Sequence, residues 1–270
     1  DAPAPTEYTT GNITLNKTNY PFLEKLQLTE ITGDGTFFRK PALIQSGGQA
    51  HVDTKAEWSE PTANEHYLSF DLYIRSKSQY NISIGKKSTI KPDAPQLTTQ
   101  DGTGIKNQSK YGNFSRDSVV GAVRFSVVDY KHDPPSKKLL WLPAPNILLK
   151  QTTDEYTLSD NMPSGESYSH VYYDTNRVQH TVSSTDVDSA FVVNNKGFVD
   201  GKFTYELGQN QNIAQLKKSS DTDTDPYYGD YGAMVTCNMW IEGEDAEARL
   251  ALVNGKFKVN LVLTKETKES

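Results

Sequence analysis

The stretch of sequence that decides the fold consists of AMVTCNMWI at 233–241, EGED at 242–245, AEARLALV at 246–253, NG at 254–255 and KFKVNLVLT at 256–264. Apolar and more polar residues alternate in the first and last of these segments, as they do in β-strands with two different faces. Between them, Asp245 is placed to cap a helix, and Asn254-Gly255 is a typical helix stop. The stretch therefore predicts a strand, an acidic turn, one short helix and a second strand, with both strands central in a sheet.

The alternation also predicts which side chains face the core. One face of the first strand carries Val235, Cys237, Met239 and Ile241. The other face carries Thr236, Asn238 and Trp240. On this basis Cys237 is a buried small hydrophobe rather than a nucleophile, and Trp240 lies on the wetter face. In the last strand, Phe257 and Leu261 are expected to face the core.

The composition is that of a polar, β-rich chain. It has 270 residues, of which 35% are hydrophobic and 15 are tyrosine, and its mean hydropathy is −0.65. The length is sufficient for a sizeable core, and the tyrosines and β-branched residues favour strands. The net charge of −6 argues against nucleic acid as a partner, because nucleic-acid binding needs a basic surface. The single cysteine excludes an internal disulfide.

Further strands are predicted elsewhere, and together they define an all-β fold. The clearest lie at 67–76, 119–128 and 139–142, and a long loop is expected at 91–117. Residues 150–230 are polar and have only weak strand patterns, so we interpret them as an elaboration rather than a second domain. The predicted fold is a jelly-roll-like antiparallel β-sandwich with long decorated loops and one short helix near the C-terminus.

Two groups of motifs resemble those of a known protein family. One is WIEGED at 240–245 with GKFKVNL at 255–261, and the other is VVGAVRFSVVD at 119–129 with LWLPAPN at 140–146. They resemble secreted surface proteins of Gram-positive bacteria that are similar in plan to the TasA/camelysin family of biofilm-matrix proteins. The resemblance implies an extracellular fibre subunit that is linked to its neighbours by an N-terminal strand, and it carries over no catalytic residue.

An N-terminal extension at 1–22 is predicted to precede a single sandwich domain at 23–270. The chain begins with Asp-Ala-Pro-Ala-Pro, which resembles the end left by a signal peptidase or by a recombinant boundary. We therefore expect an extracellular protein that is secreted with its signal peptide removed. The sequence contains no apolar run long enough to span a bilayer, so no membrane span is predicted.

Two interpretations of this extension stay open. Prolines at 3 and 5 donate no backbone hydrogen bonds, residues 6–15 have a strand pattern, and Tyr20-Pro21 separates them from the body. In the first interpretation the segment leaves its own subunit and pairs with a sheet edge of a neighbour. Its donor-strand side chains would be Tyr8, Ile13 and Leu15. In the second, residues 6–15 form the first strand of their own sandwich.

No catalytic motif is recognisable, and we predict a protein that is not an enzyme and requires no cofactor. The five histidines are His51, His66, His132, His170 and His180. None of them has metalloprotease spacing, and no nucleophile elbow, P-loop or dinucleotide fingerprint occurs. A hairpin would bring His170 and His180 together, although exposed loop histidines are the simpler interpretation. Carboxylate pairs for glycoside chemistry stay open, because their spacing is spatial.

Acidic stretches and glycosylation sequons are the remaining candidate sites. Asp221, Asp223 and Asp225 alternate in a loop and supply the oxygen ligands that calcium prefers, and the alternative is a solvated acidic loop. The acidic turn at 242–245 is explained by turn formation and helix capping, with a metal site as the alternative. Sequons for N-glycosylation lie at Asn12, Asn16, Asn81, Asn107 and Asn113.

These features define two functional hypotheses. In the first, the chain is a structural subunit of an extracellular filament, such as a pilus or a biofilm-matrix fibre, and polymerises head-to-tail with copies of itself by N-terminal donor-strand complementation. In the second, it is a monomeric cell-surface adhesin or carbohydrate-binding module that binds a glycan or surface ligand through the tyrosine-rich region at 150–230. The two hypotheses share the fold and the location but differ in the role of the N-terminal residues.

Overall fold

The computed structural model describes residues 18, 20–24, 26, 28, 30–46, 49–92, 114–115, 120, 122–143, 149–152, 155–158, 170–182, 191–193, 198–199, 202–203, 206–218, 231–243 and 257–267. These residues form one 3-10 helix, η1 (Pro21–Glu24), and strands β1 to β22, so the predicted all-β fold class is confirmed. The predicted donor strand at 6–15 and the predicted helix at 246–253 lie outside the described residues.

The largest sheet is built around β20 (Tyr231–Glu242), the strand predicted from the alternation at 233–241. The strands of this sheet are β15 (Phe191–Val193), β10 (Ser136–Leu142), β9 (Val123–Asp129), β20, β1 (Glu30–Gly33) and β2 (Phe38–Arg39) in that order, with β5 (Leu68–Ser76) and β19 (Lys217–Lys218) also paired to β20. β20 pairs antiparallel with β5 on one edge and with β9 on the other. Its last two residues pair parallel with β1, on the same edge as β5.

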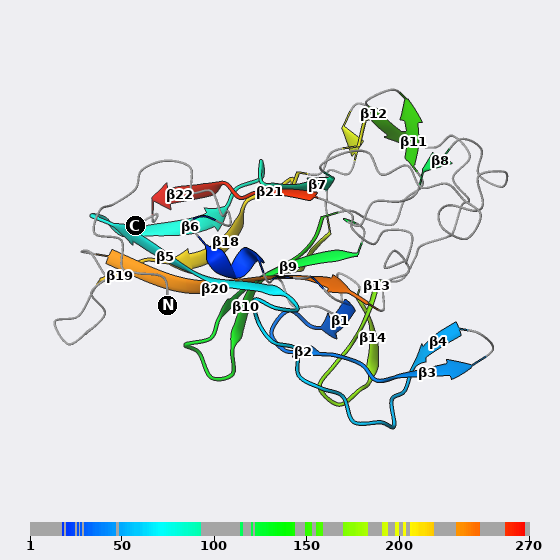
Figure 1. Cartoon of the computed structure of the whole chain (residues 1–270). Coiled ribbons are helices and arrows are strands. Elements are labelled where there is room, and N and C mark those ends of the chain that lie inside the picture. Colours follow the sequence, from blue (N-terminus) through cyan, green and yellow to red (C-terminus); the bar gives the residue numbers. More distant parts are fainter. Residues whose placement is uncertain are drawn as a thin grey trace.

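A smaller sheet packs against one face of this large sheet. Its strands are β18 (Gln211–Gln215), β6 (Tyr80–Ile84) and β22 (Leu263–Thr267). The core between the two layers contains Val123, Phe125, Val127, Leu139, Trp141, Val235, Cys237, Met239 and Ile241 from the large sheet and Ile82, Ile84 and Ile213 from the small one. Figure 1 shows the small sheet on one side of β20 and β1 and β2 on the other. The described chain is therefore sandwich-like, and the predicted burial of Cys237 is confirmed.

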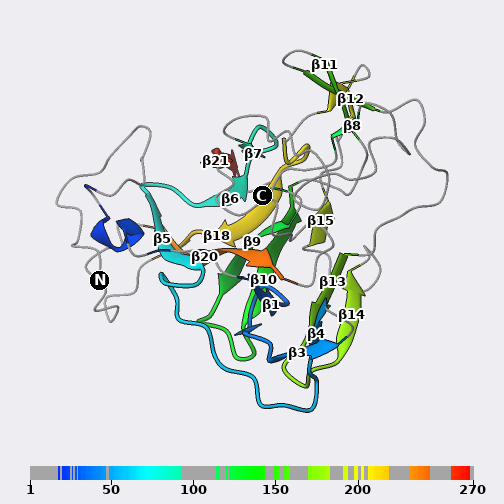
Figure 2. The same cartoon turned by 45° about the vertical axis from the view of Figure 1, so that its right-hand side comes forward.

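The remaining strands form small sheets and hairpins. One sheet contains β16 (Phe198–Val199), β17 (Lys202–Phe203), β12 (Glu155–Leu158), β11 (Leu149–Thr152) and β8 (Phe114–Ser115). Three two-stranded units are β13 (His170–Tyr173) with β14 (Gln179–Val182), β3 (Leu43–Ser46) with β4 (Gln49–Val52), and β21 (Phe257–Asn260) with β7 (Thr89–Pro92). The β13–β14 hairpin lies beside β1 (Figure 2).

The predicted position of Trp240 on a wetter face is wrong, because both faces of β20 are covered. Trp240 is 0% exposed and belongs to a second cluster with Ile31, Phe38, Leu140 and Leu142. Segment 30–40 supplies Ile31 and Phe38, and the Phe38 ring meets the Trp240 ring edge-on at 4.9 Å. The alternation marks two chemically different faces, but a segment that lies more than 200 residues before Trp240 in the chain buries the second one.

The prediction of a second central strand at 256–264 is also wrong. This stretch is divided into β21 and β22, and β22 lies at the edge of the small sheet. The break lies at Val262, whose N–H donates to Ser88 Oγ and whose carbonyl accepts the N–H of Gly85. Phe257 and Leu261 pack against the core as expected, whereas Val259 and Leu263 are 39% and 43% exposed.

Candidate functional site

The β13–β14 hairpin carries the most chemically distinctive group of exposed side chains in the described chain. Its turn is organised by Asp174, whose Oδ1 accepts the N–H groups of Asn176 and Val178 at 2.8 and 3.0 Å. Arg177 adopts a φ of 63° within this turn. The register pairs Tyr172 with His180, which places both rings on the same face of the hairpin.

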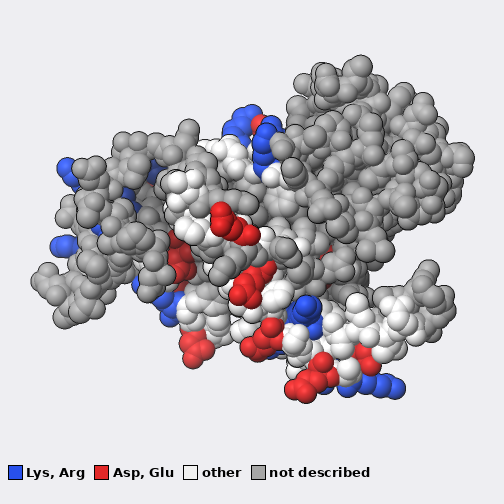
Figure 3. Space-filling model, viewed as in Figure 1, with Lys and Arg blue, Asp and Glu red and all other residues white. Residues whose placement is uncertain are grey.

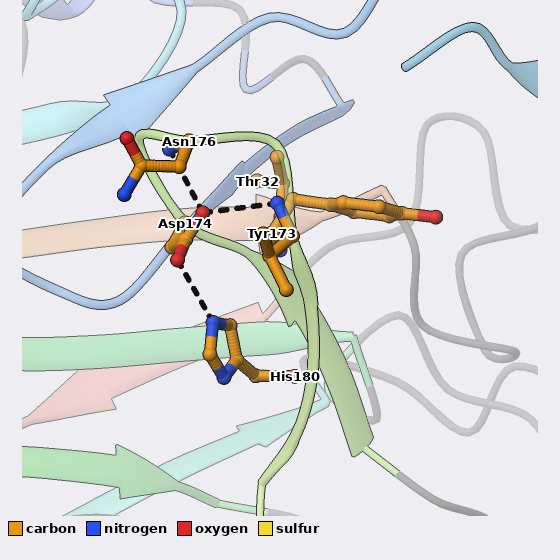
Figure 4. Close-up of polar contacts among 6 residues, drawn as sticks. Thr32, Tyr173, Asp174, Asn176 and His180 are labelled. Atoms are coloured by element: carbon orange, nitrogen blue, oxygen red, sulfur yellow. Dashed lines mark hydrogen bonds and ion pairs between the residues drawn. The ribbon is translucent and has the colours of Figure 1, made fainter.

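His180 is held by two neighbours on the hairpin, and Figure 4 shows one of them, Asp174, beside its ring. Its Nε2 lies 2.9 Å from Asp174 Oδ2, and its ring stacks on Tyr172 with centroids 5.2 Å apart. Burial alone raises the pKa of Asp174, but the hydrogen bonds from His180 and from the N–H groups of Val178 and Asn176 outweigh it and hold that pKa below its usual value. The carboxylate therefore orients the imidazole.

Within the described residues, the hydrogen-bond partner of the His180 ring is Asp174, and no hydroxyl or thiol is hydrogen-bonded to it. The part of the chain that the structure describes also holds no group of three metal-ligating side chains. The arrangement offers a planar aromatic face beside a carboxylate, which suits recognition better than chemistry.

The hairpin is attached to the body at three points. The ring of Tyr173 meets Trp58 edge-on at 5.4 Å, and the Tyr173 N–H donates to Thr32 Oγ1 at 2.8 Å. Arg177 Nη1 donates to the carbonyl of Ala56. Thr32 belongs to β1 and is fully buried, so the hairpin and the edge of the large sheet share one contact.

Beneath this contact lies a buried carboxyl, Glu242, at the end of β20. It is 1% exposed, and its Oε2 accepts the N–H of Gly33 and the Nε1–H of Trp240, each at 3.2 Å. Burial raises the pKa of Glu242 to about 8, although Thr32, Arg124, Trp240 and Gly33 act to lower it. A buried carboxyl with such a pKa is a typical mark of a functional or switch-like group.

The prediction of Glu242 as part of an acidic turn misses this environment. In the structure Glu242 is the last residue of β20 and falls on the same face as Asn238 and Trp240. All three are buried beneath segment 30–40. The only signal of this burial in the sequence is the position of Glu242, which follows Asn238 and Trp240 at the same two-residue spacing.

Most of the predicted site residues lie outside the described part of the chain. This applies to Asp221, Asp223 and Asp225, to Tyr8, Ile13 and Leu15, and to Asn12, Asn16, Asn107 and Asn113. The described sequon, Asn81, is half-buried on the middle strand of the small sheet.

Of the predicted histidines, His66 Nδ1 accepts the N–H of Thr62, and His132 lies 3.5 Å from Asp129. His170 is paired with Val182 rather than with His180. His66, His132 and His180 each have a different local partner.

The surface and the comparisons set limits on the function. In the view of Figure 3, described acidic and basic side chains form separate small groups rather than one charged patch. In the described chain, no helix has the length and apolarity that crossing a bilayer requires. Comparison with protein-family models, curated proteins and solved structures finds no match to this chain.

Proposed function

We propose that this protein is a structural subunit of an extracellular filament, in which the N-terminal segment of one copy adds a strand to the next. Two features of the described body support the proposal. The first is that Leu23, Leu26 and Leu28 pack against the main core. These anchoring contacts do not involve residues 1–18, so an exchange of that segment between copies would leave them in place.

The second feature is the edge strand β22, which is the candidate strand to accept the N-terminal segment of another copy, and the proposal depends mainly on it. It pairs with β6 along one edge, and no described strand pairs with the other. Leu263 at its start is 43% exposed, and Lys265 and Glu266 are exposed further along. A strand added here would bond the edge amides that no described strand pairs with, while the charged side chains disfavour unselective pairing. Head-to-tail addition does not close on itself and produces a filament.

A truncated protein that lacks residues 1–18 tests the proposal. We expect it to remain folded and monomeric by circular dichroism and size-exclusion chromatography, and to bind an added peptide of residues 1–18. Leu263→Asp in the truncated protein should weaken this binding. Val259→Asp, at a similarly exposed position on β21, should not. Unfolding of the truncated protein, or a failure of the peptide to bind, would reject donor-strand exchange.

The hairpin favours a second candidate function, a monomeric adhesin that binds a glycan. The observation is the stacked pair of Tyr172 and His180 beside the Asp174 carboxylate, since sugars are bound by ring faces next to polar groups. A glycan array with the native protein and with Tyr172→Ala distinguishes this function. Signals that the substitution removes support an adhesin, and a blank array with the native protein rejects it.

A further inference from the structure

Segment 30–40 lies across one face of the large sheet, and we name it the strap. Gly243 N–H donates to the carbonyl of Ile31 at 2.9 Å, and β1 pairs there with the end of β20. Further along, Ser126 Oγ donates to the carbonyl of Gly35 at 2.6 Å, and Tyr130 Oη donates to the carbonyl of Thr36 at 2.7 Å. The strap is therefore held by backbone pairing, by these side-chain hydrogen bonds and by the apolar packing of Ile31 and Phe38.

Gly35 shows how closely the strap approaches the sheet. Its φ is +89°, a conformation that glycine adopts without steric cost. A Cβ built on it would lie 3.0 Å from Ser126 Cβ and 3.3 Å from Leu140 Cδ1. The backbone of the strap thus lies directly on β9 and β10.

Glu242 is the buried polar contact at the start of the strap. Its Oε2 accepts the strap's Gly33 N–H, whereas Oε1 is buried without a hydrogen-bond partner. Among the described side chains around it, Arg124 of β9 is a charged group that is 3% exposed and donates to the carbonyl of Val123. β1 supplies Thr32 and Gly33 next to the carboxyl. An unsatisfied anionic oxygen in this site is costly, so the neutral acid is favoured.

Thr32 connects this carboxyl to the hairpin. It directly precedes Gly33, whose N–H donates to Glu242 Oε2, and its Oγ1 accepts the N–H of Tyr173 on β13. Any displacement of Thr32 that follows a change in Glu242 therefore acts directly on the hydrogen bond that attaches the hairpin to β1. Through this connection the surface pair of Asp174 and His180 is coupled to a group at the end of β20.

We propose that Glu242 is a proton-controlled latch, whose neutral form holds the strap and, through Thr32, the β13–β14 hairpin against the large sheet, and whose ionised form loosens both. The function would be a conformational response to pH at the hairpin surface. It is independent of whether the protein forms filaments. The buried carboxyl, the strap contacts and the Thr32 connection carry it together.

The direction of the response follows from linkage. The folded-state pKa of Glu242 is raised from 4.5 to about 8, so the closed strap binds a proton that the open strap releases. Closure of the strap is therefore strongest below the ordinary carboxyl pKa and weakens as the pH rises towards about 8. Over this range the equilibrium constant for opening increases by up to roughly tenfold for each pH unit. Burial raises the pKa of Tyr130, whose hydroxyl donates to the strap at Thr36, to about 12, outside this range.

Amide hydrogen exchange measured by NMR between about pH 5 and 9 tests the latch. After correction for intrinsic exchange, the protection of the Gly33 and Tyr173 amides should fall with pH and level off above about pH 8. The amide of Val127, in the centre of the core, should not follow them. In Glu242→Gln, which keeps the shape but cannot ionise, the protection of both amides should be independent of pH. A flat profile in the native protein, or the same fall in Glu242→Gln, overturns the proposal.

A second variant tests the connection through Thr32, and also serves if Glu242→Gln fails to fold. Thr32→Val keeps the volume but removes the hydroxyl that accepts the Tyr173 N–H. We expect the Gly33 amide to keep its pH-dependent protection while the Tyr173 amide exchanges fast at every pH. If the Tyr173 amide retains its native pH profile in Thr32→Val, the hairpin is not coupled to Glu242 and the proposed relay is wrong.

Discussion

Replacement of Trp240 by alanine removes the side chain on which the second, polar face of β20 depends. The indole is 0% exposed and packs edge-on against Phe38 of the strap. Its Nε1–H donates to Glu242 Oε2 at 3.2 Å. The substitution therefore opens a cavity under the strap and removes one of the donors to a buried carboxyl.

The two losses set the expected magnitude. Truncation of a buried Trp to Ala typically costs about 3–5 kcal/mol. Loss of a hydrogen-bond donor to a buried carboxyl adds about 1–3 kcal/mol. Together they predict a destabilisation of roughly 4–8 kcal/mol, which is a large part of the roughly 5–15 kcal/mol by which domains are stable.

Urea unfolding followed by circular dichroism measures this cost as a fall in the midpoint at constant slope. Phe37→Ala is the matched control, because Phe37 is an aromatic residue of the same strap but is 47% exposed. The control should cost under about 1 kcal/mol, as surface substitutions usually do. A Trp240→Ala cost as small as that of Phe37→Ala would show that the second face of β20 is wet, and the account of the strap would fail.

Three further predictions concern groups elsewhere in the chain. Burial raises the pKa of Cys237 to about 12, so its thiol should not react with a thiol reagent in the native protein at neutral pH. The thiol should react fully in urea, and fast labelling of the native protein would contradict its buried placement. Asp174→Ala should cost about 1 kcal/mol in urea unfolding, because it removes the turn's acceptor at a partly exposed site; no change would mean that the turn forms without it. If Asp221, Asp223 and Asp225 bind calcium, millimolar calcium should raise the melting temperature of the native protein. A variant in which all three are replaced by Asn should show no such rise, and the same rise in that variant would exclude the site.

Sequence patterns predicted the strands of the fold better than the covering of their faces. The alternation at 233–241 located β20 and the burial of Cys237, because a period of two reports directly which side chains share a face. It could not report that the second face is also covered. That covering depends on segment 30–40, whose contacts with Trp240 and Glu242 link positions far apart in the chain.

The candidate site was predicted less well than the fold for a related reason. Weak strands around β13 and β14 were expected, but the pairing of Asp174 with His180 depends on the register of the hairpin and on the left-handed Arg177 in its turn. The buried state of Glu242 depends on β1 and β9 meeting at the end of β20. Neither arrangement has a local sequence signature, because each is made by contacts between different strands.

Electron microscopy of the purified native protein tests the proposed function most directly. The account predicts filaments of the native chain, none from the protein lacking residues 1–18, and intact folding of that truncated protein because Leu23 and the core behind it remain. Filaments formed equally well by the truncated protein, or only single particles of the native protein at every concentration tried, would contradict assembly by an exchanged N-terminal strand.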